Sequence, residues 1–209
     1  IDDVRMISNF SSGRLGLAVA RAFLEAGAMK IEKIYYLCDR NTNAPTDDRV
    51  EVIRVMGVQG LLEALEQLLT TKKIDAVIHA MAVSDYTVKE VTTLSAIRSG
   101  GEPGGDSREN SGGDSGKPSS GEISAEGKIS SEIDDLVIVL KRTPKVIGEI
   151  KKLQEDTILV GFKLLTGVKR EVLIETGHKL LQKNRCSMVL ANDLTEITGE
   201  KHVGYLISP

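Results

Sequence analysis

The sequence predicts an α/β protein with a doubly wound, mostly parallel sheet and helices on both faces, a Rossmann-like arrangement. Segments rich in β-branched and aromatic residues alternate along the chain with segments whose apolar residues recur at helical spacing. Strands separated by helices favour parallel pairing, because each helix returns the chain to the same end of the sheet. The chain has 209 residues, 41% of them hydrophobic, which is enough for one such domain with a buried core.

The first half of the chain is expected to supply two helices and three strands. The first helix ends at Gly27 and carries apolar residues at helical spacing, namely Leu15, Val19, Ala22, Phe23 and Ala26. Strands are expected at Lys33–Cys38, Val50–Val55 and Ile74–Ala80, with an amphipathic helix at Gln59–Lys72.

The second half continues the alternation. Strands are expected at Asp135–Lys141, Thr157–Phe162, Cys186–Ala191 and His202–Ile207. Helices are expected from Pro144 to Glu155 and over Lys169–Asn184. The fixed φ angle of Pro144 suits the first turn of its helix.

One segment, Arg98–Gly121, departs from this pattern. It contains eight Gly, six Ser and two Pro in 24 residues and no hydrophobic side chain. Such a composition does not offset the entropy of ordering, so residues 98–121 are expected to form a disordered loop. A linker between two domains would have the same composition. We expect a single domain over residues 1–209, because the segments on both sides continue one strand and helix pattern.

Charge and cysteine content exclude several function classes. Lys and Arg number 27 against 30 Asp and Glu, which gives a net charge of −3. No basic excess is available to bind a nucleic acid or an anionic membrane. Cys38 and Cys186 are too few for a disulfide framework, and no apolar run is long enough for a membrane span. A cytoplasmic protein is expected.

The loops that follow strands are the places where sheets of this type bind ligands. The segment Asn9–Gly16 (NFSSGRLG) precedes the first helix, and its small residues would leave the N–H groups of the first turn open to a phosphate. An ordinary serine cap with a glycine turn explains the same residues equally well. The segment matches neither the dinucleotide fingerprint nor the P-loop motif.

Three further segments are candidates. Asp85, just past the strand that ends at Ala80, could accept hydrogen bonds from a ligand, or it could be a capping residue. Lys128 and the basic pair before Pro144 could bind phosphate, or they could be solvated surface groups. Phe162 could stack on a base beside lysines; a core phenylalanine and a solvated lysine stripe are the alternative.

Other chemistries have little support in the sequence. The three histidines, at positions 79, 178 and 202, lack metal-ligand spacing, and the nucleophile-elbow motif G-x-S-x-G is absent. His79 inside a strand is more typical of a core residue. Tyr86 and Lys89 are one residue closer together than the proton-transfer pair of short-chain reductases.

Taken together, the sequence resembles the phosphopantothenoylcysteine synthetase family, particularly its stand-alone bacterial form. The segments that carry the resemblance are IDDVRMISNFSSGRLG (1–16), IHAMAVSDYT (78–87), KISS (128–131), VLKRTPKVI (139–147), LVGFKLL (159–165) and KNRCSMVLANDLTEI (183–197). Members of the family begin with a strand and a Gly-Gly-Thr loop before the position of Ile1 and continue past Pro209. The chain is therefore expected to be truncated at both ends.

The resemblance implies a ligase of coenzyme A biosynthesis that joins 4′-phosphopantothenate to cysteine through an acyl-cytidylate. Such an enzyme consumes CTP with Mg²⁺ and releases pyrophosphate and CMP. The alternative function that fits the fold is an NAD(P)-dependent reductase, although no acidic residue is evidently placed for the ribose.

The resemblance also implies the roles of individual residues. Asn9 and Lys128 would serve the chemistry, while the metal ligands stay unassigned. The nucleotide would contact Ser11, Gly13, Gly16, His79, Ala80, Met81, Asp85, Lys128, Arg142, Thr143, Pro144, Lys145, Phe162, Lys179, Lys183 and Asn192. Phosphopantothenate would contact Arg5, Asn9, Met81, Ala82 and Asp85. Arg5 would reach a neighbouring subunit, so a homodimer is expected.

Overall fold

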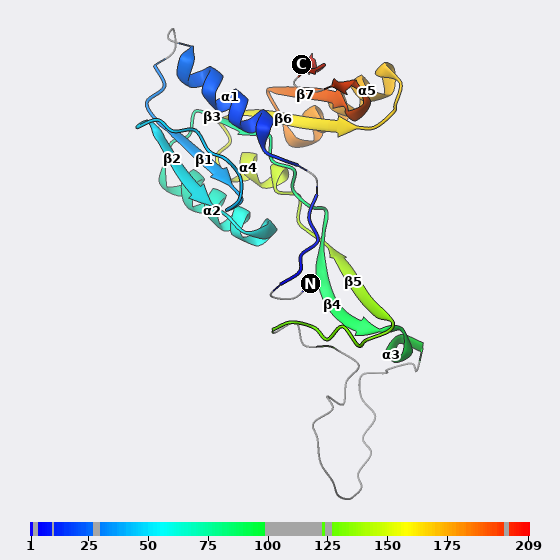
Figure 1. Cartoon of the computed structure of the whole chain (residues 1–209). Helices are drawn as coiled ribbons and strands as arrows, with labels where there is room; N and C mark the ends of the chain where they lie inside the picture. The colour runs from blue at the N-terminus through cyan, green and yellow to red at the C-terminus, as the bar shows by residue number, and fades with distance from the viewer. Residues whose placement is uncertain (2–3, 10, 27–29, 99–122, 124–126, 199–200) are drawn as a thin grey trace, which may run out of the picture. The chain divides into compact units, whose positions relative to one another are not determined.

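The structure is a computed structural model that describes residues 1, 4–9, 11–26, 30–98, 123, 127–198 and 201–209 (Figure 1). The chain divides into two compact units. We call Phe10–Val83 with Pro144–Pro209 the α/β unit, and Ile1–Asn9 with Ser84–Thr143 the ribbon unit. The prediction of a single domain stays a prediction.

The α/β unit contains the alternating helices and strands. Its elements are α1 (Arg14–Glu25), β1 (Ile34–Cys38), β2 (Val50–Arg54), α2 (Gly57–Thr71), β3 (Ala76–His79), α4 (Ile147–Leu153), β6 (Ile158–Leu165), α5 (Arg170–Asn184), β7 (Met188–Asp193), η1 (Leu194–Glu196), β8 (Ile197–Thr198), β9 (Lys201–His202) and β10 (Tyr205–Ile207). The ribbon unit contains β4 (Tyr86–Thr93), α3 (Leu94–Arg98) and β5 (Leu136–Arg142). Among the described helices, none is both long enough and apolar enough to cross a lipid bilayer.

The sheets of the α/β unit are mostly parallel. β1 pairs with β2 in parallel, and β3, β6 and β7 form a parallel set in which β10 adds an antiparallel edge strand. The predicted α/β class is therefore confirmed. The parallel strands lie in two sheets, ordered β1-β2 and β10-β7-β6-β3.

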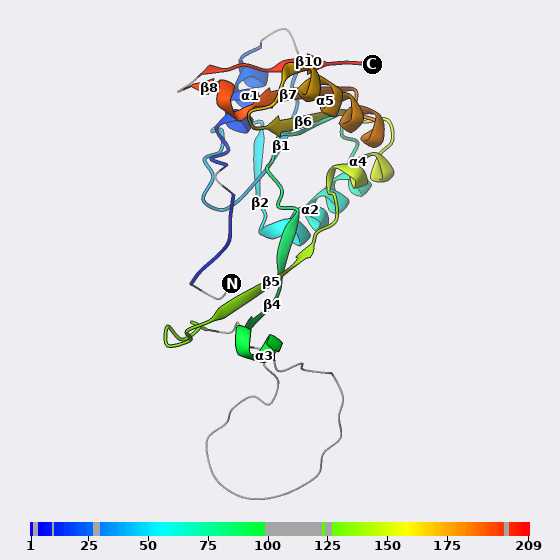
Figure 2. The same cartoon turned by 90° about the vertical axis from the view of Figure 1, so that its right-hand side faces the viewer.

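The core of the α/β unit lies between these strands and the layer of α2, α4 and α5. Ile150 of α4 and Leu159 of β6 are fully buried there, and Leu173 of α5 is 1% exposed. Helix α1 lies on the other side of the strands in both views (Figures 1 and 2). Helices on both faces of the sheet agree with the predicted fold class.

The segment predicted as a strand at Asp135–Lys141 does not join the parallel sheet. It forms β5, which pairs antiparallel with β4, a strand that the sequence analysis did not predict. The pairing buries Val91 and Thr92 of β4, which are consecutive residues and therefore lie on opposite faces of the ribbon.

Two predicted boundaries also differ from the structure. The helix predicted from Pro144 begins at Ile147. A tighter turn comes first, because Gly148 N and Glu149 N donate to Lys145 O and Val146 O at 2.9 and 3.0 Å, three residues back. The strand predicted at His202–Ile207 is interrupted before β10. Its first residue, His202, pairs with Ile197 of β8, whereas Tyr205–Ile207 pair with β7. Residues 99–121 of the predicted loop lie outside the described residues, while Arg98 ends α3.

Candidate nucleotide and substrate site

The predicted site residues are divided between the two units. The ribbon unit carries Arg5, Asn9, Asp85, Lys128, Arg142 and Thr143; the α/β unit carries Ser11, Gly13, Gly16, His79, Ala80, Met81, Ala82, Pro144, Lys145, Phe162, Lys179, Lys183 and Asn192.

The start of α1 has the properties of an anion site. Gly13 adopts a left-handed conformation (φ 71°, ψ 2°), and its carbonyl accepts the first helical bond from Leu17 N at 3.0 Å. Within the described part of the chain no side chain caps the helix, and its first turn holds no acidic residue, so the expected alternative of a serine cap is not formed. Unpaired N–H groups and the positive end of the helix dipole favour a bound phosphate here.

Phe162 and Asn192 share one face of the sheet. A Cβ on the neighbouring Gly161 would meet Ile147 and Leu180, which places the layer of α4 and α5 on the Gly161 side. Alternation along β6 turns Phe162 to the opposite face. Asn192, opposite Leu164 in the register, points the same way. Its side chain is only 7% exposed and makes no hydrogen bond to a described residue, so an amide is available for a ligand.

Lys179 and Lys183 do not join Phe162. Helix α5 packs against the opposite face of the sheet through Leu173, Gly177 and Leu181, and both lysines are exposed. Lys179 Nζ forms an ion pair with Glu175 Oε1 at 2.6 Å. The structure therefore separates the predicted base-stacking residue from the predicted lysine pair.

His79 is a partly buried neutral group. It ends β3 opposite Gly161 and so faces the helical layer. Burial lowers the pKa of His79 from 6.5 to about 4, because desolvation disfavours the imidazolium ion. At neutral pH the imidazole is uncharged, which agrees with the expected core histidine.

The ribbon unit brings several predicted residues together at one end of β4 and β5. Thr143 N donates to Asp85 O at 3.0 Å and Thr143 Oγ1 to Ser84 O at 2.6 Å, while Arg142 pairs with Tyr86 in the register. In the same unit, Arg5 Nη2 donates to Ile129 O at 2.9 Å. Arg5 thus lies beside the backbone that carries Lys128, and the side chains of both Lys128 and Asn9 are exposed.

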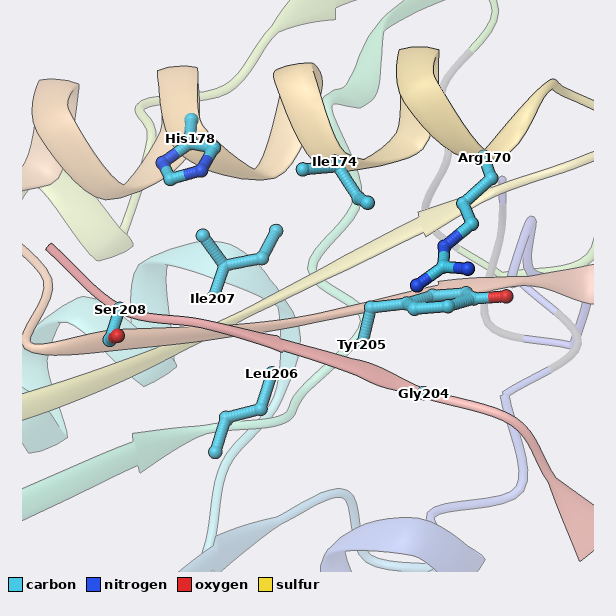
Figure 3. Close-up of a pocket in the computed structure, with 8 residues that line it drawn as sticks. All are labelled: Arg170, Ile174, His178, Gly204, Tyr205, Leu206, Ile207 and Ser208. Carbon is cyan, nitrogen blue, oxygen red and sulfur yellow. The ribbon is translucent and has the colours of Figure 1, made fainter.

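A separate hollow lies between α5 and β10 in the α/β unit. Its volume is about 460 Å³. It is lined by Arg170, Ile174, His178, Gly204, Tyr205, Leu206, Ile207 and Ser208. Figure 3 shows the Arg170 guanidinium over the Tyr205 ring, 4.8 Å from the ring centre. None of the predicted site residues lines this hollow, so the predicted site is elsewhere.

Comparison with known proteins places the chain in a family. Residues 1–101 and 121–204 match the family described as the DNA/pantothenate metabolism flavoprotein C-terminal domain. The chain belongs to this family. The resemblance to phosphopantothenoylcysteine synthetase is thereby confirmed.

Relatives of this flavoprotein C-terminal domain family match nearly the whole chain. The coenzyme A biosynthesis bifunctional protein CoaBC of Methanocaldococcus jannaschii is 30% identical over 203 residues, covering 94% of this chain and 38% of that protein. CoaBC of Thermococcus kodakarensis is 30% identical over 207 residues, covering 99% and 41%. The chain thus spans about two fifths of these curated relatives. The crystal structure of the DNA/pantothenate metabolism flavoprotein from Streptococcus pneumoniae has a TM-score of 0.80 and 27% identity, covering 100% of this chain and 83% of that one.

The structure also shows residues of this flavoprotein-domain fold that the sequence analysis missed. Asp193 is 3% exposed and accepts hydrogen bonds from Thr195 Oγ1 (2.6 Å) and from the backbone N of Thr195, Gly167 and Val168 (2.8, 2.9 and 2.9 Å). These bonds hold the pKa of Asp193 far below its usual range. Asp193 therefore fixes the loop between β6 and α5 beside Asn192. An Asp at the carboxyl end of a buried strand was the available signal.

One acidic residue bears on the alternative function. Asp39 directly follows β1, the strand after the α1 helix. Asp39 Oδ1 accepts a hydrogen bond from Asn41 N at 3.0 Å.

Proposed function

We propose that the chain catalyses the joining of 4′-phosphopantothenate to cysteine with CTP as the energy source, as a cytoplasmic enzyme of coenzyme A biosynthesis. The observation that carries the proposal is the uncapped start of α1, where Gly13 leaves the first-turn N–H groups open, in a chain of this family. Relatives named for coenzyme A biosynthesis support the substrate assignment.

The reaction needs charge neutralisation more than it needs a nucleophilic side chain. The substrate carboxylate attacks the α-phosphate of CTP, a new C–O–P linkage forms, and pyrophosphate leaves. The cysteine amine then attacks the activated carbonyl, an amide forms, and CMP leaves. Both substrates of the first step are anionic, so helix N–H groups and lysines lower its barrier by stabilising negative charge.

Individual residues have distinct parts in this proposal. The N–H groups at the start of α1 hold the triphosphate, and Phe162 and Asn192 contact the base on their shared face of the sheet. Lys128 and Arg142 of the ribbon unit supply positive charge. Asn9 is neutral and can both donate and accept hydrogen bonds, so it holds the acyl-cytidylate without repelling it.

Mg²⁺ accompanies the triphosphate in this proposal. Within the described ranges there is no group of three or more His, Cys, Asp or Glu side chains that could cage a metal ion. Mg²⁺ commonly takes its ligands from substrate phosphates, water and one carboxylate. The exposed Asp85 could supply this carboxylate. The ion would supply further charge neutralisation at the phosphates.

A homodimer is part of the proposal, with Arg5 reaching the substrate of the neighbouring subunit. The segment that carries Arg5 exposes large apolar side chains, with Val4 67%, Met6 76% and Ile7 58% accessible. Such a segment gains from being covered by a partner. Light scattering coupled to size-exclusion chromatography tests the dimer, and a monomeric mass at assay concentration would contradict it.

The activity is tested by incubating the chain with CTP, 4′-phosphopantothenate and cysteine and measuring pyrophosphate and CMP. We expect both products only when phosphopantothenate is present, and amide formation only when cysteine is added. ATP and GTP replace CTP in parallel reactions. Equal rates with all three nucleotides would contradict the assignment of CTP. Absence of pyrophosphate with every nucleotide would contradict the proposed ligase activity.

The second candidate function is an NAD(P)-dependent reductase. The position of Asp39 after β1 favours it, because a carboxylate there can bind a ribose hydroxyl. Titration with NADPH followed by its fluorescence decides between the two. Tight binding of NADPH that CTP does not displace would favour the reductase.

A further inference from the structure

We propose that Arg54 is a positioning residue for the phosphate-binding turn at the start of α1, acting through the Asp39–Thr42 turn. The inference rests on the proposed function, because it takes Ser11–Gly16 as the triphosphate site. Neither Arg54 nor Thr42 was among the residues expected from the sequence.

A single guanidinium nitrogen organises the Asp39–Thr42 turn. Arg54 Nη1 lies 2.7 Å from Asp39 O, 2.6 Å from Thr42 O and 3.2 Å from Cys38 Sγ. Thr42 N donates to Asp39 O at 3.0 Å and closes the turn. Arg54 therefore holds the carbonyls at both ends of the turn, and hydrogen bonds from a charged donor are stronger than those between neutral groups.

The Asp39–Thr42 turn also packs against Gly13, at the start of α1. A Cβ built on Gly13 would lie 2.5 Å from Thr42 Cγ2, so the threonine methyl occupies the space where a side chain would be. Gly13 is also held in a left-handed conformation, with φ 71°. A displaced Thr42 would leave Gly13 and the N–H groups that follow it without this support.

The chain offers a matched control in Arg49, which precedes β2 while Arg54 ends it. Arg49 Nη2 lies 2.8 Å from Asp47 Oδ2 and 3.3 Å from Leu24 O, a carbonyl in the last turn of α1. Both arginines thus bond backbone carbonyls near α1. Arg54 acts at the start of the helix, where the phosphate would bind, and Arg49 acts at its end.

The kinetic test compares Arg54→Met, Arg54→Lys and Arg49→Met in the ligase assay. Arg54→Met is expected to raise the KM for CTP about tenfold while kcat changes less than about twofold, since the loss affects triphosphate binding. Arg54→Lys keeps a charged donor and is expected to restore most of the affinity. Arg49→Met is expected to leave the KM for CTP unchanged. An equal rise in both methionine variants, or in neither, would overturn the proposal.

Amide hydrogen exchange of the chain without nucleotide separates this inference from the proposed function. We expect the amides of Thr42 and Leu17 to exchange about tenfold faster in Arg54→Met than in Arg49→Met, because opening of the turn becomes easier. If the wild-type chain shows no CTP-dependent activity, the proposed function fails, and exchange alone then decides whether Arg54 positions the turn. Unchanged exchange in Arg54→Met contradicts the inference in either case.

Discussion

The α/β unit and the ribbon unit differ in how much apolar surface each buries. The α/β unit has a continuous core in which Ile150, Leu159 and Val189 are fully buried. In the described part of the ribbon unit, the buried hydrophobic residues are Val91 and Ile129, while Tyr86 and Leu140 are 50% and 44% exposed. The ribbon unit nevertheless carries Asn9, Lys128 and Asp85. Stability and catalysis should therefore respond to substitutions in different units.

The largest expected effect is on the stability of the α/β unit. Ile150→Ala removes a fully buried side chain and is expected to lower the free energy of unfolding by about 3 kcal/mol through lost burial and a new cavity. Urea unfolding followed by far-UV circular dichroism measures it. Val91→Ala, in the ribbon unit, is the control and should leave the main transition in place. Equal shifts from the two variants would show that both units unfold together.

The second largest expected effect is a loss of catalytic rate that leaves stability unchanged. Lys128→Gln is expected to lower the turnover of CTP about 100-fold, because it removes a cation from a site where phosphates and a carboxylate meet. Lys89→Gln changes another exposed lysine of the ribbon unit, one paired with Glu90 at 3.7 Å, and should be silent. Rates of pyrophosphate release and urea midpoints are measured for both. A stability loss in Lys128→Gln that matches its rate loss would make the residue structural.

A third prediction concerns pH and the α/β unit. Because the pKa of His79 is about 4 in the fold and 6.5 when solvated, the unfolded chain takes up the proton first as the pH falls. Above pH 6.5, the pKa in the unfolded chain, His79 does not lower the free energy of unfolding. As the pH falls from there towards about 4, the pKa in the fold, the free energy of unfolding decreases, and the loss is about 2 kcal/mol near pH 5. His79→Gln should remove this part of the pH dependence. Identical unfolding curves across pH for wild type and His79→Gln would contradict the burial of a neutral imidazole.

The smallest effect is a gain in stability. Thr157 is 1% exposed and its hydroxyl has no hydrogen-bond partner among the described residues, so Thr157→Val is expected to stabilise the α/β unit by about 1 kcal/mol. Thr92 in the ribbon unit is also buried but does have an interaction partner, and Thr92→Val should not stabilise. Thermal unfolding measures both variants. A loss of stability in Thr157→Val would show that the hydroxyl has a partner in solution.

Most helices and strands of the α/β unit could be predicted from the order of residues alone. Helices α2 and α5 and strands β1, β6 and β7 fall within one to three residues of their predicted bounds, because hydrophobic periodicity is a property of neighbouring residues. The glycine turn before α1 was likewise recognisable from Asn9–Gly16.

Which of these elements meet became clear only from the folded chain. β5 looked like another strand of the parallel sheet, yet it pairs with β4 in a separate unit. Phe162 and Lys179 are 17 residues apart, and the sheet places them on opposite sides. Asp193 and Arg54 bond to loops far from them in sequence, at Gly167 and Thr42. Strand partners, sheet faces and loop contacts depend on residues distant along the chain, so no local pattern specifies them.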